Sequence, residues 1–321
     1  MHASVYPRLR SHSRLLLLAG IALAVHPAAA EATVVNVDEF SVMRNGGALF
    51  DDTFSANTTL SGGNGTILPS GVSFNGDGPA NYFVGGTIPE TTANNGQATL
   101  NTANGVLIPQ PPPFIPFIQD TRAFLQTGTV ASGTHSLTPT TSFTVTALFD
   151  LSVPSVILGT YALNLSNRYV SNGRMGNVLE LRMRQCQAGV GLCGSDNGTV
   201  LQLFWGDFVN NTETLINQVQ LSAAQLANSQ IEFEFTKGAN SDVINAFYGL
   251  GSGNTLGSFN GSLTSLDSTD SATDVFTSSL QTVQAGVEAF DPVAAVPEPS
   301  SLMQICGGLL GLALAWRRRR S

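Results

Sequence analysis

Strict alternation of apolar and polar residues is the feature that most constrains how this chain can fold. The segment 143–149 reads Phe-Thr-Val-Thr-Ala-Leu-Phe, and the segment 231–236 reads Ile-Glu-Phe-Glu-Phe-Thr. Successive side chains of a β-strand point to opposite faces of its sheet, so this pattern buries one face and leaves the other polar. The alternation therefore predicts half-buried β-strands and argues against a mainly helical protein.

Other strands and their turns follow the same rule. Segments 179–184, 200–205 and 244–250 alternate or are continuously apolar, and only 222–227 has the composition of a short helix. Short strands separated by glycine-containing turns are typical of antiparallel sandwiches. We expect an all-β body, an antiparallel β-sandwich of jelly-roll type. The turn signals are Asn45-Gly46-Gly47, Asn75-Gly76, Asn95-Gly96 and Asn104-Gly105.

The first 30 residues have the three parts of a secretory signal peptide. Three arginines precede an apolar run from Leu15 to Val25, and the stretch closes on Ala28 and Ala30, which fit a small-x-small cleavage site. The apolar run is too short to span a bilayer. We expect export by the Sec machinery and cleavage after Ala30, which makes residues 31–295 the body.

The charge of that body limits its partners. Three of the 14 basic residues lie in the signal peptide and four in the tail, whereas only Glu298 of the 22 acids lies outside the body. Seven basic and 21 acidic residues remain, a formal charge of −14. Such a charge repels nucleic acid and anionic lipid, so we expect neither as a partner.

Cysteine use fits an oxidising compartment. Cys186 and Cys193 are the only cysteines of the body, and they flank a short loop between two predicted strands. We expect a structural disulfide, because a redox-active pair would need Cys-x-x-Cys spacing and nearby basic groups. Cys306 lies in the apolar tail, where we expect an inert thiol, with acylation as the alternative.

The last 26 residues, 296–321, combine three parts in a fixed order. Val296-Pro297-Glu298-Pro299 is an extended linker, because proline disfavours helix at the residue before it. The uncharged run from Leu302 to Trp316 would span about 22 Å as a helix, which is less than the hydrocarbon core of about 30 Å. Local thinning of the bilayer and arginine side chains that reach the headgroups can make up the difference. A cluster of arginines at the end stays in the cytoplasm and leaves the body outside. These residues are Arg317, Arg318, Arg319 and Arg320.

This order resembles the PEP-CTERM sorting signal of Gram-negative bacteria. The resemblance implies a transmembrane sorting helix that an exosortase, a membrane protease-transpeptidase, cuts near the Pro-Glu-Pro. It implies an inner-membrane intermediate followed by delivery to the cell surface or to an exopolysaccharide or biofilm matrix. A plain tail anchor is the alternative. Nothing in the tail specifies the chemistry of the body, because one signal serves many unrelated proteins.

The body has a weaker resemblance to concanavalin-like lectin and glucanase sandwiches, carried by segments 49–54, 82–84 and 98–100. Such glucanases carry Glu-x-Asp-x-x-Glu on a strand. Glu232 and Glu234 stand two residues apart, about 6.6 Å along a strand, which is within the range of paired glycosidase carboxylates. Lys237 replaces the last glutamate of the pattern. We expect a solvated polar strand face rather than a catalytic pair.

Other chemistry has little support. His135 is the only histidine of the body, and the chain has no Gly-x-Ser-x-Gly nucleophile motif or zinc-ligand pattern, so we expect no cofactor and no metal. Calcium, which takes oxygen ligands, is the plausible ion, but solvated turn acids are the preferred interpretation. The acids concerned are Asp51, Asp52, Asp267, Asp270 and Asp274. The aromatic residues that could stack on sugars are Tyr82, Tyr169, Trp205 and Tyr248, although the apolar run 201–205 favours a core position for Trp205.

The sequence thus predicts an exported, exosortase-sorted surface or matrix protein with a structural or adhesive role and no catalysis. A lectin-like carbohydrate-binding module is the first alternative. A glycan hydrolase that uses Glu232 and Glu234 is the second.

Overall fold

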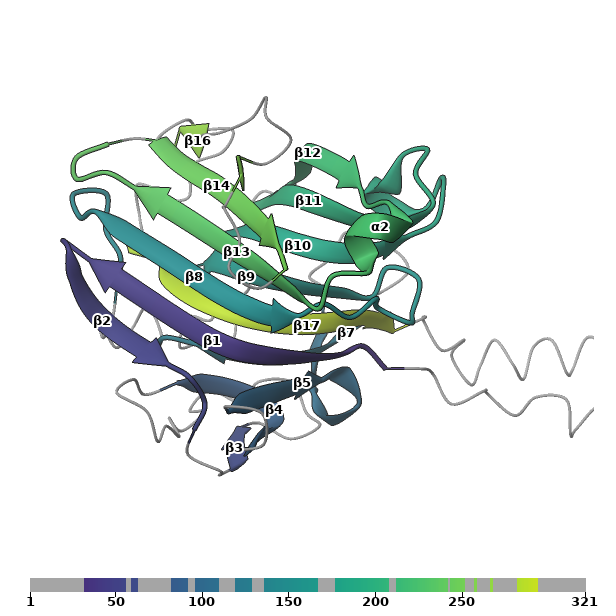
Figure 1. Cartoon of the computed structure of the whole chain (residues 1–321), viewed down its shortest axis with the longest axis horizontal. Coiled ribbons are helices and arrows are strands. Elements are labelled where there is room, and N and C mark those ends of the chain that lie inside the picture. The colour runs from purple at the N-terminus through teal and green to yellow at the C-terminus, as the bar shows by residue number, and fades with distance from the viewer. Residues whose placement is uncertain are drawn as a thin grey trace, which may run out of the picture. The chain divides into compact units, whose positions relative to one another are not determined.

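We analysed a computed structural model of the chain (Figure 1). The structure describes residues 32–55, 59–62, 82–91, 96–109, 119–128, 136–166, 177–207, 212–241, 243–251, 257–258, 266–267 and 282–293. The predicted signal peptide and sorting tail, with Ala28, Ala30, Val296–Pro299 and Arg317–Arg320, lie outside these residues. No helix within the described ranges combines the length and the apolar character of a membrane span.

One layer of the body is an antiparallel sheet, seen at the front of Figure 1. Its order is β2–β1–β8–β13–β14, and the first half of β1 also pairs with β5 (Gln97–Asn101). Short strands β15 (Gly257–Ser258) and β16 (Leu266–Asp267) pair with β14. We call this layer the front sheet. Its main strands are β1 (Val34–Arg44), β2 (Gly47–Asp52), β8 (Phe143–Asp150), β13 (Gln230–Lys237) and β14 (Val243–Leu250).

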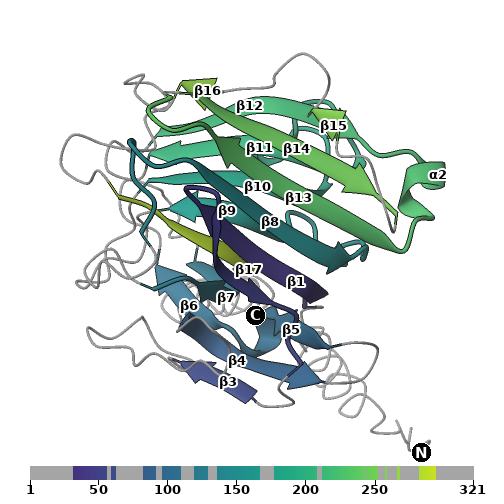
Figure 2. The same cartoon turned by 60° about the vertical axis from the view of Figure 1, so that its left-hand side comes forward.

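The second layer, the back sheet, has the order β12–β11–β10–β9–β17–β7 and is antiparallel throughout. The last of the described strands, β17, lies between β9 and β7, as Figure 2 shows. Strand β6 (Val106–Pro109) pairs with β7. The main strands are β7 (Gln119–Gln126), β9 (Thr160–Ser166), β10 (Val178–Cys186), β11 (Gly198–Asp207), β12 (Thr212–Gln220) and β17 (Gln284–Val293).

Strand β4 (Phe83–Thr91) belongs to both layers. Its first residues, Phe83–Gly85, pair with β7 of the back sheet, and its last two, Glu90 and Thr91, pair with β5 beside the front sheet. Strand β3 (Thr59–Gly62) adds to its free side. The described strands therefore form one continuous network that folds over into two layers.

The core lies between the layers. Alternate residues of β8 and β13 are buried, and they meet the inner residues of β9, β10, β11 and β17 in one hydrophobic cluster. Three rings from both sheets pack at its centre: Phe149 and Phe233 of the front sheet lie 5.2 and 6.4 Å, centroid to centroid, from Tyr161 of the back sheet. Each buried aromatic ring stabilises the fold by roughly 1.5–3 kcal/mol. The predicted all-β antiparallel fold is confirmed.

One predicted turn, the predicted disulfide and the predicted short helix are also confirmed. Asn45 and Gly46 both have positive φ, 53° and 79°, as a two-residue turn between antiparallel strands requires, and they join β1 to β2. The disulfide Cys186–Cys193 closes the tip of the β10–β11 hairpin, with a 3₁₀ turn at Gly191–Cys193. The short helix α2 (Ala223–Leu226) occupies the expected place and begins with a capping box at Ser222.

Candidate functional site

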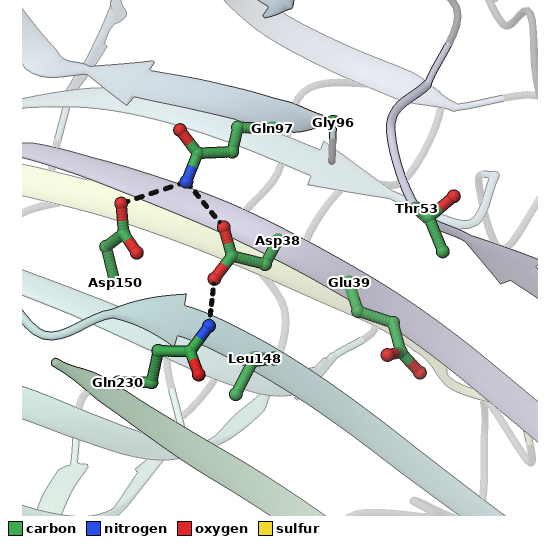
Figure 3. A pocket seen from close by; sticks show the side chains of 8 residues that line it. All are labelled: Asp38, Glu39, Thr53, Gly96, Gln97, Leu148, Asp150 and Gln230. Atoms are coloured by element: carbon green, nitrogen blue, oxygen red, sulfur yellow. Dashed lines mark hydrogen bonds between the residues drawn. The ribbon is translucent and has the colours of Figure 1, made fainter. Parts of the chain in front are cut away.

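A cavity of about 420 Å³ opens on the outer face of the front sheet (Figure 3). Strands β1, β5, β8 and β13 each contribute a polar side chain to it. The lining residues are Asp38, Glu39, Thr53, Gly96, Gln97, Leu148, Asp150 and Gln230.

A β-bulge supplies two of these acids. Within β1, the pairing with β8 shifts between Val37 and Glu39, so Asp38 is an extra residue. Val37 and Phe40 are both buried, and the two residues between them, Asp38 and Glu39, both reach the outer face. In a regular strand with the same sequence and no bulge, strict alternation from Val37 would point the Glu39 side chain into the core. The bulge therefore concentrates negative charge at the cavity.

Three amide side chains hold the carboxylates in place. Gln97 Nε2 donates to Asp38 Oδ1 at 2.7 Å and to Asp150 Oδ2 at 3.0 Å. Gln230 Nε2 donates to Asp38 Oδ2 at 2.7 Å, and Asn36 Nδ2 donates to Asp150 Oδ2 at 3.0 Å. Figure 3 shows Gln97 bridging the two aspartates and Glu39 set apart from this network.

The surroundings of the cavity raise the pKa of two of its acids, Asp38 and Glu39. Burial raises the pKa of the Asp38 carboxyl, and the neighbouring Asp150 carboxylate raises it further, against the lowering effect of the two glutamine donors. Burial and the charge of Asp51 likewise raise the pKa of Glu39. Carboxylates with fixed amide partners accept hydrogen bonds from hydroxyl or amine donors, and this is the chemistry that the cavity offers.

The cavity wall also depends on a close backbone contact. Gly96 has a φ of +96°, and a Cβ atom there would lie 2.2 Å from the carbonyl oxygen of Thr53. Only glycine fits such a position without displacing the neighbouring backbone. Gly96 thus lets the start of β5 lie against the residues that follow β2, whereas Asn95 of the predicted Asn95-Gly96 turn lies outside the described residues.

Glu232 and Glu234 lie on the same outer face but do not line the cavity. Both side chains are half-buried, while Phe233 and Phe235 point into the core. Burial raises the pKa of both carboxyls, with a further rise from Glu39 at Glu232 and from Glu232 at Glu234. The predicted alternation of β13 is confirmed, with its polar face half-buried rather than fully solvated; the hydrolase alternative stays a prediction.

The outer face of the back sheet is not a solvated polar face. Alternation in 179–184 led us to expect a single buried face, but Glu180 and Arg182 are as buried as Leu179 and Leu181. Arg182 Nη1 donates to Glu180 Oε2 at 2.9 Å, and its guanidinium lies 3.9 Å from the centre of the Phe204 ring. Burial lowers the pKa of Arg182, whereas Glu180 raises it.

A second buried ion-pair group lies on the neighbouring strands of that face. Arg122 Nη1 donates to Glu288 Oε2 at 2.7 Å, and its Nη2 donates to Asp120 Oδ2 at 2.9 Å. Asn164 Nδ2 also donates to Glu288, at 2.9 Å. Removing one partner of such a group leaves a buried charge uncompensated. We therefore assign both groups a structural role.

Several predicted site residues turn out to be structural. Asp52 is buried and accepts hydrogen bonds from Tyr82 Oη and Phe54 N, both at 2.8 Å, so the expectation of a solvated turn acid was wrong for it. The rings of Tyr82 and Trp205 are buried in the hydrophobic core, so neither ring is accessible for stacking on a sugar. Tyr248 is half-buried against the core.

The remaining candidates divide between exposed and undescribed positions. Asp51 is exposed, as expected of a turn acid. His135, Tyr169, Asp270 and Asp274 lie outside the described residues, and so does the side chain of Asp267. Within the described part of the chain, no group of three or more His, Cys, Asp or Glu side chains has the geometry of a metal site.

One feature that sequence reasoning missed joins the two ends of the body. Asp291, in β17, accepts a hydrogen bond from Thr33 N at 2.8 Å and further bonds from the hydroxyls of Thr33 and Thr102. Thr33 N also donates to Thr102 Oγ1 at 3.0 Å. The start and the end of the body are therefore locked together. No sequence signal reveals this, because the residues are 258 positions apart.

Comparison with known proteins identifies the tail. The PEP-CTERM protein-sorting motif matches residues 295–320. No curated protein and no solved structure matches the chain, so the likeness of the body to lectins and glucanases has no support from these comparisons. The motif match confirms the sequence prediction for the tail: the chain carries the signal of an exported protein that an exosortase sorts to the cell surface.

Proposed function

We propose that the body is a structural or adhesive protein of the cell surface or extracellular matrix and has no catalytic activity. One observation carries this proposal: the sorting motif begins at residue 295, two positions after the end of β17, so the signal directly follows a complete β-body. The whole described body is thus the delivered part.

Delivery proceeds through processing at both ends. The Sec machinery exports the chain, and signal peptidase cuts after Ala30. The run 302–316 and the four terminal arginines then hold an intermediate in the inner membrane. Exosortase cuts near Pro297–Pro299 and releases the body to the surface, where extracellular polysaccharide is its proposed partner.

Two features of the body support a role outside the cell. The disulfide Cys186–Cys193 closes an exposed hairpin tip, and disulfides persist in oxidising compartments. Charged groups on the outer face of the back sheet are buried and paired, so both sides of that sheet contribute to a rigid body. Buried, paired charges of this kind suit the structural role of a scaffold or an adhesin.

The sorting step is tested by replacing Pro297, Glu298 and Pro299 with alanine in the native host. We expect the variant to remain in the inner membrane with its tail attached. Alanine at the adjacent Ser300 and Ser301 is the matched control and should leave delivery unchanged. Unchanged surface delivery and C-terminal mass of the first variant would defeat the proposal.

The cavity of the front sheet favours a second candidate, carbohydrate binding. Asp38 and Asp150 present carboxylate oxygens fixed by Gln97 and Gln230, and such oxygens accept hydrogen bonds from vicinal sugar hydroxyls. Affinity electrophoresis of the surface protein through gels that contain host polysaccharide measures this binding. Asp38→Ala should abolish any retardation, and Glu232→Gln, on the same face but outside the cavity, should not. Equal retardation of both variants would exclude the cavity.

A further inference from the structure

Exposed aliphatic side chains gather at one end of the sandwich. Within the described residues, five large hydrophobic side chains are exposed, and three of them, Val34 (46 %), Val153 (48 %) and Ile157 (49 %), lie at the end where β1 begins and β8 ends. Met43 (44 %) and Val243 (37 %) lie at the opposite end. A single exposed aliphatic residue is ordinary, but a cluster indicates an interaction surface.

The segment that carries two of these side chains is firmly held. Residues 151–159 connect β8 to β9, and Ser152 Oγ donates to the carbonyl of Val34 at 3.1 Å while Ser155 Oγ donates to that of Ala32 at 3.3 Å. These bonds place Val153 beside the start of β1. The apolar side chains are thus presented by a fixed connection.

Backbone strain at Leu158 strengthens this conclusion. Leu158 has a φ of +66°, which a branched side chain rarely adopts. Its N–H donates to the carbonyl of Gln185 at 2.7 Å, and its side chain packs against the disulfide Cys186–Cys193. Strain of this kind persists only where the surroundings determine the conformation. The disulfide tip therefore fixes the end of the connection through its contacts with Leu158.

The same end is where the chain leaves the body toward the sorting motif. Gly159 is the last residue of the connection, and a Cβ atom there would lie 2.5 Å from Thr33 Oγ1 and 2.8 Å from Asp291 Oδ1. The lock between Thr33 and Asp291 thus lies directly behind the connection, and β17 ends two residues after Asp291. Val34 at the start of β1, and Val153 and Ile157 on the connection, therefore lie at the same end of the body as this exit.

The tether to the membrane is short. Eight residues, 294–301, separate the end of β17 from the first residue of the apolar run, Leu302. At about 3.3–3.6 Å per residue, they reach at most about 29 Å. A tether of this length holds the body at a local concentration on the order of millimolar relative to the lipid, so a contact too weak to act in free solution becomes populated.

Charge decides which end can approach the lipid. The body carries a formal charge of −14, and anionic lipid repels it. Residues 151–159, Leu-Ser-Val-Pro-Ser-Val-Ile-Leu-Gly, contain no ionisable side chain. An uncharged aliphatic surface enters the headgroup region of a bilayer at low desolvation cost.

We propose that Val34, Val153 and Ile157 form a membrane-contacting surface that rests on the outer leaflet of the inner membrane while the tail is attached, and leaves it after the tail is cut. This proposal rests on the sorting route proposed above, since the tether exists only in the uncleaved protein. It assigns the disulfide tip and the Thr33–Asp291 lock a joint task, which is to orient this end of the body toward the lipid.

The test uses the protein with its tail, reconstituted in phosphatidylcholine vesicles that carry a doxyl-labelled lipid as quencher. In a Cys306→Ser background with the native disulfide intact, Ile157→Cys receives an environment-sensitive fluorophore. Met43→Cys, equally exposed at the opposite end, is the matched control. We expect the doxyl lipid to quench the label at position 157 about twofold or more and the label at 43 not at all, since interfacial groups lie within about 10 Å of the acyl boundary.

Three results overturn the proposal. The first is an unquenched label at 157, and the second is equal quenching at 157 and 43. The third is slower tail removal from Val153→Ser/Ile157→Ser in the host, combined with no quenching at 157 in the vesicles, which contain no exosortase. The last result would assign the surface to the exosortase. The sorting route is judged separately, by the C-terminal mass of the wild-type protein: an uncut tail defeats the route, whereas a cut tail with no quenching at 157 defeats this inference alone.

Discussion

At the residue scale, two acids of this acidic body are buried and accept hydrogen bonds that hold other segments in place. Asp52 fixes Tyr82 and Phe54, and Asp291 fixes Thr33 and Thr102. Lys237, the only lysine of the chain, is buried and donates to the carbonyls of Pro139, Thr141 and Gly238. Sequence patterns show such residues as polar but do not reveal their partners, because those partners come from remote segments.

Loss of the Asp291 carboxylate should strongly destabilise the body. Asp291→Ala leaves the buried N–H of Thr33 without its carboxylate acceptor and removes two hydroxyl contacts, so we expect the free energy of unfolding to fall by about 3 kcal/mol. Urea unfolding followed by fluorescence measures it. Asp291→Asn, which keeps the shape and one acceptor oxygen, should cost less; an equal loss in both variants would contradict the role of the charge.

The acids of the front sheet should make stability depend on pH. Glu39, Glu232 and Glu234 have raised pKa values, so the folded protein binds these protons more tightly than the unfolded chain does. Their stabilising effect is complete below the unfolded pKa and is lost as pH rises through the raised folded values. The melting temperature should therefore increase as pH falls from 7 toward about 4.5.

The double variant Glu232→Gln/Glu234→Gln isolates this effect. It should melt higher than the wild type at pH 7, by no more than about 2 °C because both carboxyls are partly solvated, and its rise on acidification should be smaller. Differential scanning calorimetry at several pH values provides the comparison. An unchanged pH profile would contradict the raised pKa values of these two carboxyls, to which burial contributes most.

At the scale of single elements, strands with one solvated face were predictable and strands with two buried faces were only partly so. β8 and β13 match their alternating segments closely. In β10, alternation located the strand but gave the wrong environment for Glu180 and Arg182, because paired charges can be buried and a pattern of residue types does not record pairing. The bulge at Asp38 is visible only as a change of phase between Val37 and Phe40.

The disulfide tip should contribute to global stability. Cys186 and Cys193 close a loop with a sequence separation of 7, and Leu158 packs against them. Replacing both with serine should lower the free energy of unfolding by about 2–3 kcal/mol, since the unfolded chain gains the entropy that the crosslink removes. Chemical unfolding of oxidised wild type and double variant measures the difference, and a variant as stable as the wild type would contradict it.

At the scale of the whole molecule, the sequence predicts the sorting signal well but does not predict the order of the strands. The sorting tail is a local pattern, so its residues alone predicted it, and the motif match at 295–320 agrees. The strand order was not predictable, because β17 pairs with β7 and β9 across more than 100 residues. The cavity escaped prediction for the same reason: Asp38, Gln97, Asp150 and Gln230 come from four separate strands.

The central claim is that this β-body is delivered to the cell surface by removal of its tail. The intact mass of the protein recovered from the surface fraction of its native host tests this claim most directly. We predict a chain that begins at Glu31 and ends between Pro297 and Ser300. A surface protein that retains Arg317–Arg320 would be a plain membrane anchor and would contradict the claim.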